Sequence, residues 1–162
     1  MPVFQDTTLA DYATSRNGYS VTTGRRKSGK LVLADAAIKA LGTKILVPSP
    51  GPGKMIIFRS GLLVARFTAG YTNISGVTAT GNYEVAAAIV GTAFANAAAF
   101  STFFSTAGSK QLPVAAAGGL LVSTDVDDAA LEFVLANADG ALTGGNVANR
   151  LEVHYEYSIA RV

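Results

Sequence analysis

The segment from Leu46 to Lys54 reads LVPSPGPGK and holds three prolines and two glycines within six residues. Proline fixes φ and lacks an amide donor, while glycine adopts conformations that other residues avoid. The segment can therefore be neither helix nor central strand, and we predict a sharp turn that restarts as a strand at Lys54. Before it, a brief helix is predicted over Ala36 to Leu41, with Asp35 as its N-cap and Gly42 at its end.

Strand patterns dominate the rest of the chain. Met55 to Phe67 is the longest apolar run and predicts a long strand, bent or bulged at Ser60-Gly61. Leu151 to Ile159 alternates apolar and polar residues, which is typical of a half-buried antiparallel strand, with Glu152, His154, Glu156 and Ser158 on its polar side. Shorter strands are predicted over residues 31–33, 44–47, 82–90, 120–123 and 131–136. Residues 93–119 are compatible with a helix or with a loop containing strand pieces.

Short strands separated by glycine-rich turns predict an all-β fold: a jelly-roll-like antiparallel β-sandwich with an extended N-terminal arm and one short helix. We place the basic arm at residues 1–30 and the sandwich domain at residues 31–162. With 162 residues, 49% of them hydrophobic, the chain is long enough for one domain with a core. Much of its apolar content is alanine, which buries little area, so we expect an oligomer to stabilise it.

Composition also narrows the classes of function. The chain has no cysteine, which excludes disulfides and thiolate chemistry. The window from Ala86 to Ala107 is alanine-rich and interrupted by polar residues, so we expect no membrane helix there. The N-terminus shows no secretory signal pattern. We expect no membrane partner.

Charge is distributed unevenly along the chain. Ten Lys and Arg against three Asp give +7 through Arg66, and three cations against eight acids give −5 after it. This asymmetry fits contact with nucleic acid, a basic arm lying on a neighbour's acidic surface, or solvated side chains. The basic patch lacks interleaved aromatic residues, so we expect no specific nucleic acid partner. The candidate contact residues are Arg25, Arg26, Lys27 and Lys30.

The sequence offers little that resembles a catalytic or metal site. A P-loop needs a glycine where Pro48 stands and Ser or Thr where Met55 stands. Asp125, Asp127 and Asp128 lack the spacing of an EF-hand, so a solvated turn is the favoured interpretation, with calcium binding left open.

His154 is the only histidine, which excludes a two-histidine metal site and leaves one candidate for a Ser-His-Asp arrangement. Four glutamates, at 84, 132, 152 and 156, could converge as a glycosidase pair, although nothing specific singles them out. We therefore expect a protein that is not an enzyme, with no catalytic residue, no cofactor and no metal.

Two stretches resemble small structural proteins of tailed bacteriophages. LADAAIKAL at 33–41 followed by LVPSPGPGKMI at 46–56 is similar to their Ile-Lys-Ala-Leu segment, Val-Pro-Ala-Pro-Gly-Ala-Gly-Lys turn and hydrophobic strand. The ending from Gly144 to Tyr155 is similar to their closing Gly-Gly-Asp-Gly-x-Leu-x-Val-x-Tyr strand. The resemblance covers residues 31–69 and 139–160. It departs at Ser49 and Pro52 and in the insertion 146–149.

This resemblance implies a jelly-roll-like virion protein, often trimeric, of the kind that decorates (cements) capsids. The implied partners are the major capsid protein and two further copies of this chain, with the protein on the capsid surface after assembly in the host cytoplasm. Arg25, Arg26, Lys27 and Lys30 would then contact capsid or subunit. The alternative is a tail or fibre-base component that binds glycan or a host receptor, with Tyr71 and Tyr83 exposed around a shallow site.

Overall fold

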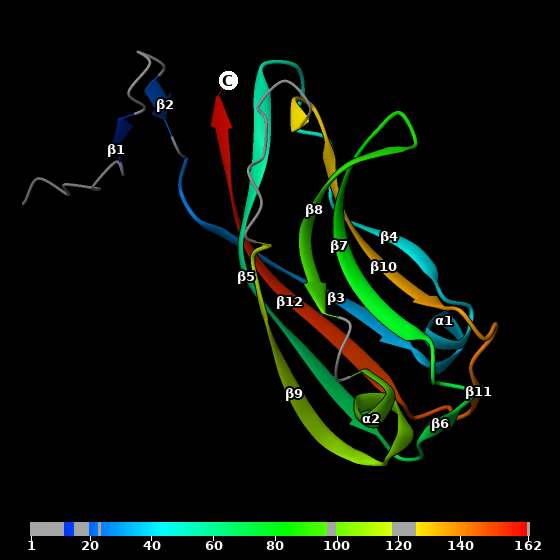
Figure 1. Cartoon of the computed structure of the whole chain (residues 1–162). Coiled ribbons are helices and arrows are strands. Elements are labelled where there is room, and N and C mark those ends of the chain that lie inside the picture. Colours follow the sequence, from blue (N-terminus) through cyan, green and yellow to red (C-terminus); the bar gives the residue numbers. More distant parts are fainter. Residues whose placement is uncertain (1–11, 15–19, 23, 97–99, 118–125, 162) are drawn as a thin grey trace, which may run out of the picture.

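The computed structural model describes residues 12–14, 20–22, 24–96, 100–117 and 126–161. Most of them lie in two four-stranded antiparallel sheets that face each other, β3-β12-β5-β9 and β4-β10-β7-β8 (Figure 1). The elements, in chain order, are β1 (Tyr12–Thr14), β2 (Ser20–Thr22), β3 (Lys27–Ala34), α1 (Asp35–Lys39), β4 (Gly42–Val47), β5 (Lys54–Phe67), β6 (Tyr71–Thr72), β7 (Val77–Val85), β8 (Ala88–Asn96), α2 (Phe100–Ser105), β9 (Gly108–Ala115), β10 (Ala130–Asn137), β11 (Thr143–Gly144) and β12 (Arg150–Arg161).

The eight strands of the two sheets pair in a nested order. β3 pairs with β12, β4 with β10, β5 with β9, and β7 with β8, every pair being antiparallel. The first strand thus pairs with the last, the second with the seventh, and so on inward, as in a long hairpin rolled into two sheets. This is the jelly-roll arrangement of two packed sheets. The predicted all-β sandwich is confirmed.

The turn after β4 is fixed by the acidic segment before β10. The Asp128 Oδ1 atom accepts hydrogen bonds from the Ser49 hydroxyl and, at 2.8 Å, from the Gly51 amide. The Asp127 Oδ1 atom accepts the Lys54 amide at 3.0 Å. Within the turn, Gly51 and Gly53 have φ of 90° and 71°, in the left-handed region that glycine tolerates best. The predicted restart at Lys54 is confirmed, while Asp127 and Asp128 support this turn instead of being merely solvated.

Aromatic side chains fill the end of the sandwich next to α2, which Figure 1 shows beside β6 and β9. Phe67 lies 5.2 Å from Tyr71 and 5.5 Å from Phe104, measured between ring centroids. The Lys110 ammonium donates a 2.7 Å hydrogen bond to the Phe103 carbonyl and lies 5.5 Å from the Phe67 ring centroid. Burial lowers the pKa of Lys110. These contacts make α2 part of the core. The described residues therefore contain two helices, whereas the sequence predicted a single short one.

The first helix is real but its predicted cap was wrong. Ala34 occupies the N-cap without a side-chain hydrogen bond, and Asp35 is the first helical residue. The Asp35 carboxylate instead accepts a 2.9 Å bond from the Tyr71 hydroxyl and pairs with Lys39 at 2.8 Å. A tertiary partner has therefore replaced the local capping bond, and the Lys39 bond is the main reason that the pKa of Asp35 is lowered.

Two predicted strands also differ from the structure. β3 begins at Lys27 instead of residue 31, because residues 27–30 continue the ladder with β12. The predicted strand 82–90 is two strands, β7 and β8, joined at Ala86 and Ala87, whose φ values of 49° and 67° form the turn. The expected strand 120–123 lies outside the described residues. So does most of the predicted arm, which stays a prediction.

The bulge in β5 falls at Arg59, one residue before the predicted position, since Glu156 pairs with Ser60 and Tyr157 with Phe58. Bulges twist the strands locally. Beyond this bulge the buried side of β12 changes: Ser158 is fully buried and accepts a 3.2 Å bond from Arg59 Nε. The predicted outward position of Ser158 was therefore wrong, although the alternation holds from Leu151 to Tyr157.

No helix among the described residues is long and apolar enough to cross a membrane.

Candidate functional site

The structure places the four predicted contact residues in two locations. Arg25 and Arg26 are exposed in the segment before β3, and Lys27 is the first residue of that strand. Lys30 lies further along β3, paired in register with His154 on the outer side of the sheet. Lys27 and Lys30 therefore belong to the ladder of an edge strand and not to an unpaired arm.

A groove at one end of the sandwich gathers cations from three segments of the chain. Its volume is about 470 Å³. Arg25 and Lys27 line it from the segment entering β3, Lys54 from the start of β5, and Arg161 from the end of β12. We call this the basic groove. Its remaining lining residues are Gly24, Pro50, Ile159 and Ala160.

Two of these cations face each other across strands. Lys54 is the register partner of Arg161 in the β5–β12 ladder, and both side chains are exposed. Directly opposed like charges destabilise a sheet. No carboxylate of the described residues lies within 4.0 Å of any of the four side-chain cations. The groove therefore presents positive charge that this part of the chain does not neutralise.

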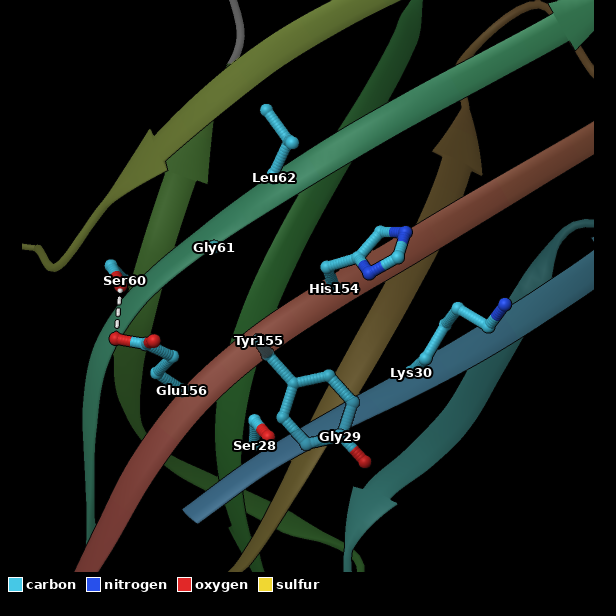
Figure 2. Close-up of a pocket in the computed structure, with 9 residues that line it drawn as sticks. All are labelled: Ser28, Gly29, Lys30, Ser60, Gly61, Leu62, His154, Tyr155 and Glu156. Atoms are coloured by element: carbon cyan, nitrogen blue, oxygen red, sulfur yellow. Dashed lines mark hydrogen bonds between the residues drawn. The ribbon is translucent and has the colours of Figure 1, made fainter. Parts of the chain in front are cut away.

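The second concavity is a shallow depression on the outer face of β3, β12 and β5, with a volume of about 570 Å³ (Figure 2). Its floor is the row Gly29–Tyr155–Gly61, which are register partners on the three strands. Figure 2 shows the Tyr155 ring lying across Gly29. A Cβ at residue 29 would stand 2.3 Å from the ring carbon Cζ, so only glycine leaves room for the ring, whose hydroxyl donates to the Leu46 carbonyl at 2.6 Å.

The polar groups around this depression pair with carboxylates. His154 Nε2 lies 2.9 Å from Glu152 Oε2, and the Ser60 hydroxyl donates to Glu156 at 3.1 Å. Lys30 and Arg66 lie 4.0 and 3.4 Å from Glu152, and the His154 bond is the main reason that the pKa of Glu152 is lowered. His154 and Ser60 thus each contact a carboxylate, and they do not form a serine–histidine pair.

The four glutamates that the sequence offered for glycoside hydrolysis fall into two pairs on different sheets, and Glu84 and Glu132 are neighbours. Glu152 and Glu156 lie on β12, while Glu84 and Glu132 lie on β7 and β10 of the other sheet. Glu132 is only 6% exposed, and its Oε2 atom receives no hydrogen bond from the described residues. Burial and the neighbouring Glu84 carboxyl raise the pKa of Glu132 to about 7. Within the described part of the chain, no group of three His, Cys, Asp or Glu is placed to hold a metal ion.

The aromatic platform expected for the glycan-binding alternative is absent at the named positions. Tyr71 and Tyr83 are 2% and 1% exposed, so neither lies at the surface. Tyr83 accepts a bond from the Phe58 amide at 3.0 Å, and burial raises the pKa of both phenols. The prediction that these tyrosines surround an open site was wrong, because their rings fill the core while their hydroxyls find partners there.

The sequence-based reading missed Lys54 and Arg161 as site residues. Each lies at the end of a predicted strand, far from the basic patch in the chain. Only the pairing of β5 with β12, and of β12 with β3, brings them beside Arg25 and Lys27. Only the register of these strands could have predicted the site, and no local sequence motif specifies that register.

No protein-family model matches the chain. No curated protein sequence matches it either. Similar solved structures include a chain of the cyanophage Pam1 capsid asymmetric unit, with 18% identity, a TM-score of 0.45, and coverage of 98% of this chain and 99% of that chain. Infectious bursal disease virus, Gt strain, aligns with 15% identity, a TM-score of 0.33, and coverage of 94% and 38%. Mud crab tombus-like virus aligns with 13% identity, a TM-score of 0.28, and coverage of 99% and 90%.

Proposed function

We propose that this chain is a structural protein of a bacteriophage virion, a decoration (cement) subunit that binds between capsomers as a homotrimer. The observation that carries the proposal is the nested pairing of eight strands into a two-sheet jelly roll, an architecture used by viral capsid proteins, lectins and cupins. Buried tyrosines weigh against a lectin-like platform. The described residues offer no three-ligand metal cluster of the kind a metal-dependent enzyme needs.

The two stretches that resemble phage structural proteins meet in space, which supports the assignment. Asp35, from the first stretch, bonds Tyr71, and Gly145, from the closing stretch, lies against both. A Cβ at residue 145 would stand 2.7 Å from the Asp35 carboxylate and 2.4 Å from the Tyr71 ring. Residues 110 positions apart in the chain thus depend on each other sterically. This steric dependence explains why the two stretches occur together in one jelly roll.

Binding without chemistry is the proposed mechanism. Area buried between the trimer and the capsomers would offset the outward pressure of packaged DNA. Two large apolar side chains support subunit contact: Ile45 is 61% exposed and Ile89 is 63% exposed, on β4 and β8 of the same sheet. β4 and β8 are the two opposite edge strands of that sheet, so each side chain offers a separate apolar contact. The partners in this proposal are the major capsid protein and two copies of this chain, on the outer surface of a virion assembled in the host cytoplasm.

We further propose that the N-terminal segment and the cations Arg25, Arg26, Lys27 and Lys30 contact acidic groups of the capsid or of a neighbouring subunit. A truncation that keeps these four cations tests the role of the segment that precedes them. Because β3 begins at Lys27, the deletion should stop at residue 23 and leave the edge strand complete.

The truncated protein is expected to elute as a trimer with an unchanged circular dichroism spectrum and to bind undecorated capsids far more weakly than the full chain. Full occupancy of capsids by the truncated protein would refute the role of the segment. A monomeric full-length protein would refute the trimer. The full-length protein with the substitution Glu156→Gln serves as a control for purification and folding.

A further inference from the structure

We infer that the basic groove is a docking site for a short acidic peptide segment of a partner protein. This inference deepens the proposed function, on which it rests, by naming the chemistry that the capsid or a neighbouring subunit would present to this chain.

Charge is concentrated in the groove at a cost to this chain. Lys54 and Arg161 are direct cross-strand partners, and Arg25 and Lys27 approach them from a third segment. That approach is held by a 2.9 Å hydrogen bond from the Gly24 amide to the Ile159 carbonyl. A Cβ at residue 24 would stand 2.6 Å from that same oxygen, so glycine is what allows the basic segment to lie so close.

Local rules that a sequence breaks without compensation mark functional sites. Here the broken rule is the avoidance of opposed like charges. Anionic groups placed in the groove would supply the compensation that the described residues lack.

The groove is also held rigid. Its wall at Pro50 belongs to the turn that Asp128 binds through the Gly51 amide and the Ser49 hydroxyl. Asp127 binds the Lys54 amide at 3.0 Å, and the Asp128 amide donates to the Lys54 carbonyl at 2.9 Å. The backbone of Lys54 is thus fixed on both sides. A site whose walls are already ordered loses little conformational entropy when a ligand binds.

The surroundings of the cations favour a peptide over a nucleic acid backbone. Pro50 and Ile159 give the groove apolar walls, which suit aliphatic side chains between carboxylates. Asp127 and Asp128 stand next to the groove, on the segment bound to Lys54, where they would repel any anion. A nucleic acid backbone carries a phosphate at every nucleotide and cannot avoid them, whereas a peptide can place its uncharged residues there. Nucleic acid binders that lack sequence preference use stacking aromatics, and none of the described residues that line this groove is aromatic. A short segment with two or three carboxylates meets these constraints.

The test measures binding of a fluorescent, end-capped hexapeptide, Glu-Val-Glu-Val-Glu-Val, to the full chain by anisotropy at low ionic strength. A Gln-Val peptide of the same length and a six-nucleotide oligothymidine are the comparison probes. The groove variant is Lys54→Gln with Arg161→Gln. The matched control is Lys30→Gln with Arg66→Gln, which removes the same charge from the outer face of the same sheet.

We expect the groove variant to bind the acidic peptide about 10-fold more weakly, a difference of about 1.4 kcal/mol that two exposed ion pairs can supply. The control variant should change binding less than about 2-fold, and added salt should weaken the wild-type interaction. Equal loss in the two variants would overturn the site, and equal binding of the Gln-Val peptide would overturn its charge selectivity. Tighter binding of oligothymidine that depends on Lys54 and Arg161 would overturn the peptide as the occupant.

Capsid occupancy separates the role of the groove from the decoration role of the whole protein. A Lys54→Gln, Arg161→Gln protein that still occupies capsids fully would remove the groove from the contact while leaving decoration in place. A wild-type protein that binds the acidic peptide but never appears on capsids would refute decoration while leaving the groove as a peptide site.

Discussion

Raising the pH should destabilise this protein through one buried carboxyl, and Glu132→Gln should abolish the effect. Glu132 lies on β10 with Ile45 and Asn82 as its register partners on the neighbouring strands. The charged group facing it is the Glu84 carboxyl, on β7. With Oε2 lacking a hydrogen-bond donor among the described residues, the ionised form is poorly stabilised.

The sign and the magnitude follow from linkage. The pKa of Glu132 is raised to about 7 in the folded chain from an ordinary value of 4.5. The contribution of protonated Glu132 to the free energy of unfolding is therefore fully present below pH 4.5. It is lost as the pH rises to about 7, and the free energy does not change further through this group above that pH. At 1.36 kcal/mol per pKa unit the loss is about 3 kcal/mol. Between pH 5 and pH 8 most of this loss, about 2 to 3 kcal/mol, should be measurable.

Urea unfolding at pH 5 and pH 8, at one fixed protein concentration, measures this contribution. Other groups also titrate in this range, so the informative quantity is the difference between wild type and Glu132→Gln at each pH. When the pH is raised from 5 to 8, the free energy of unfolding of the glutamine variant should increase by about 2 to 3 kcal/mol relative to that of the wild type. Glu156→Gln, which removes an exposed carboxylate on the other sheet, should gain almost nothing. A Glu132→Gln protein that follows the wild-type pH dependence would refute the reasoning.

Three further changes test the packing, each by urea unfolding of the full chain. Asp128→Ala leaves the Gly51 amide and the Ser49 hydroxyl without their acceptor and should cost about 1–3 kcal/mol; no loss would mean that water satisfies the turn equally well. Phe104→Ala empties a fully buried position between Phe67 and Tyr71 and should cost about 3–5 kcal/mol, a value below 1 kcal/mol being incompatible with α2 as part of the core. Gly29→Ala places a methyl group within 2.3 Å of the Tyr155 ring and should cost about 1–3 kcal/mol, whereas a neutral result would show that the ring is free to move.

Local signals in the sequence were sufficient for the elements that depend on nearest neighbours. The prolines and glycines after Val47 predicted both the turn and the start of β5, because these residues restrict φ wherever they stand. Alternation from Leu151 to Tyr157 predicted β12, since one face of that strand packs on the core. The two-sheet class followed from the number of such strands and turns.

Features that depend on distant partners were beyond local patterns. Ala86 and Ala87 form a hairpin turn with positive φ, although alanine carries no turn signal, so the pairing of β7 with β8 imposes the conformation. Asp35 has a good capping side chain but binds Tyr71 instead. Lys54 and Arg161 become neighbours only through the register of β5 and β12, which is why the basic groove could not be predicted.

Electron microscopy of purified virions, compared with virions produced without this protein, tests the central claim most directly. The proposal predicts trimeric density on the outer surface of the head, between capsomers, into which the two-sheet jelly roll fits with the basic groove facing acidic residues of the shell. Density confined to the tail or fibre base, or wild-type virions that lack the protein, would contradict it.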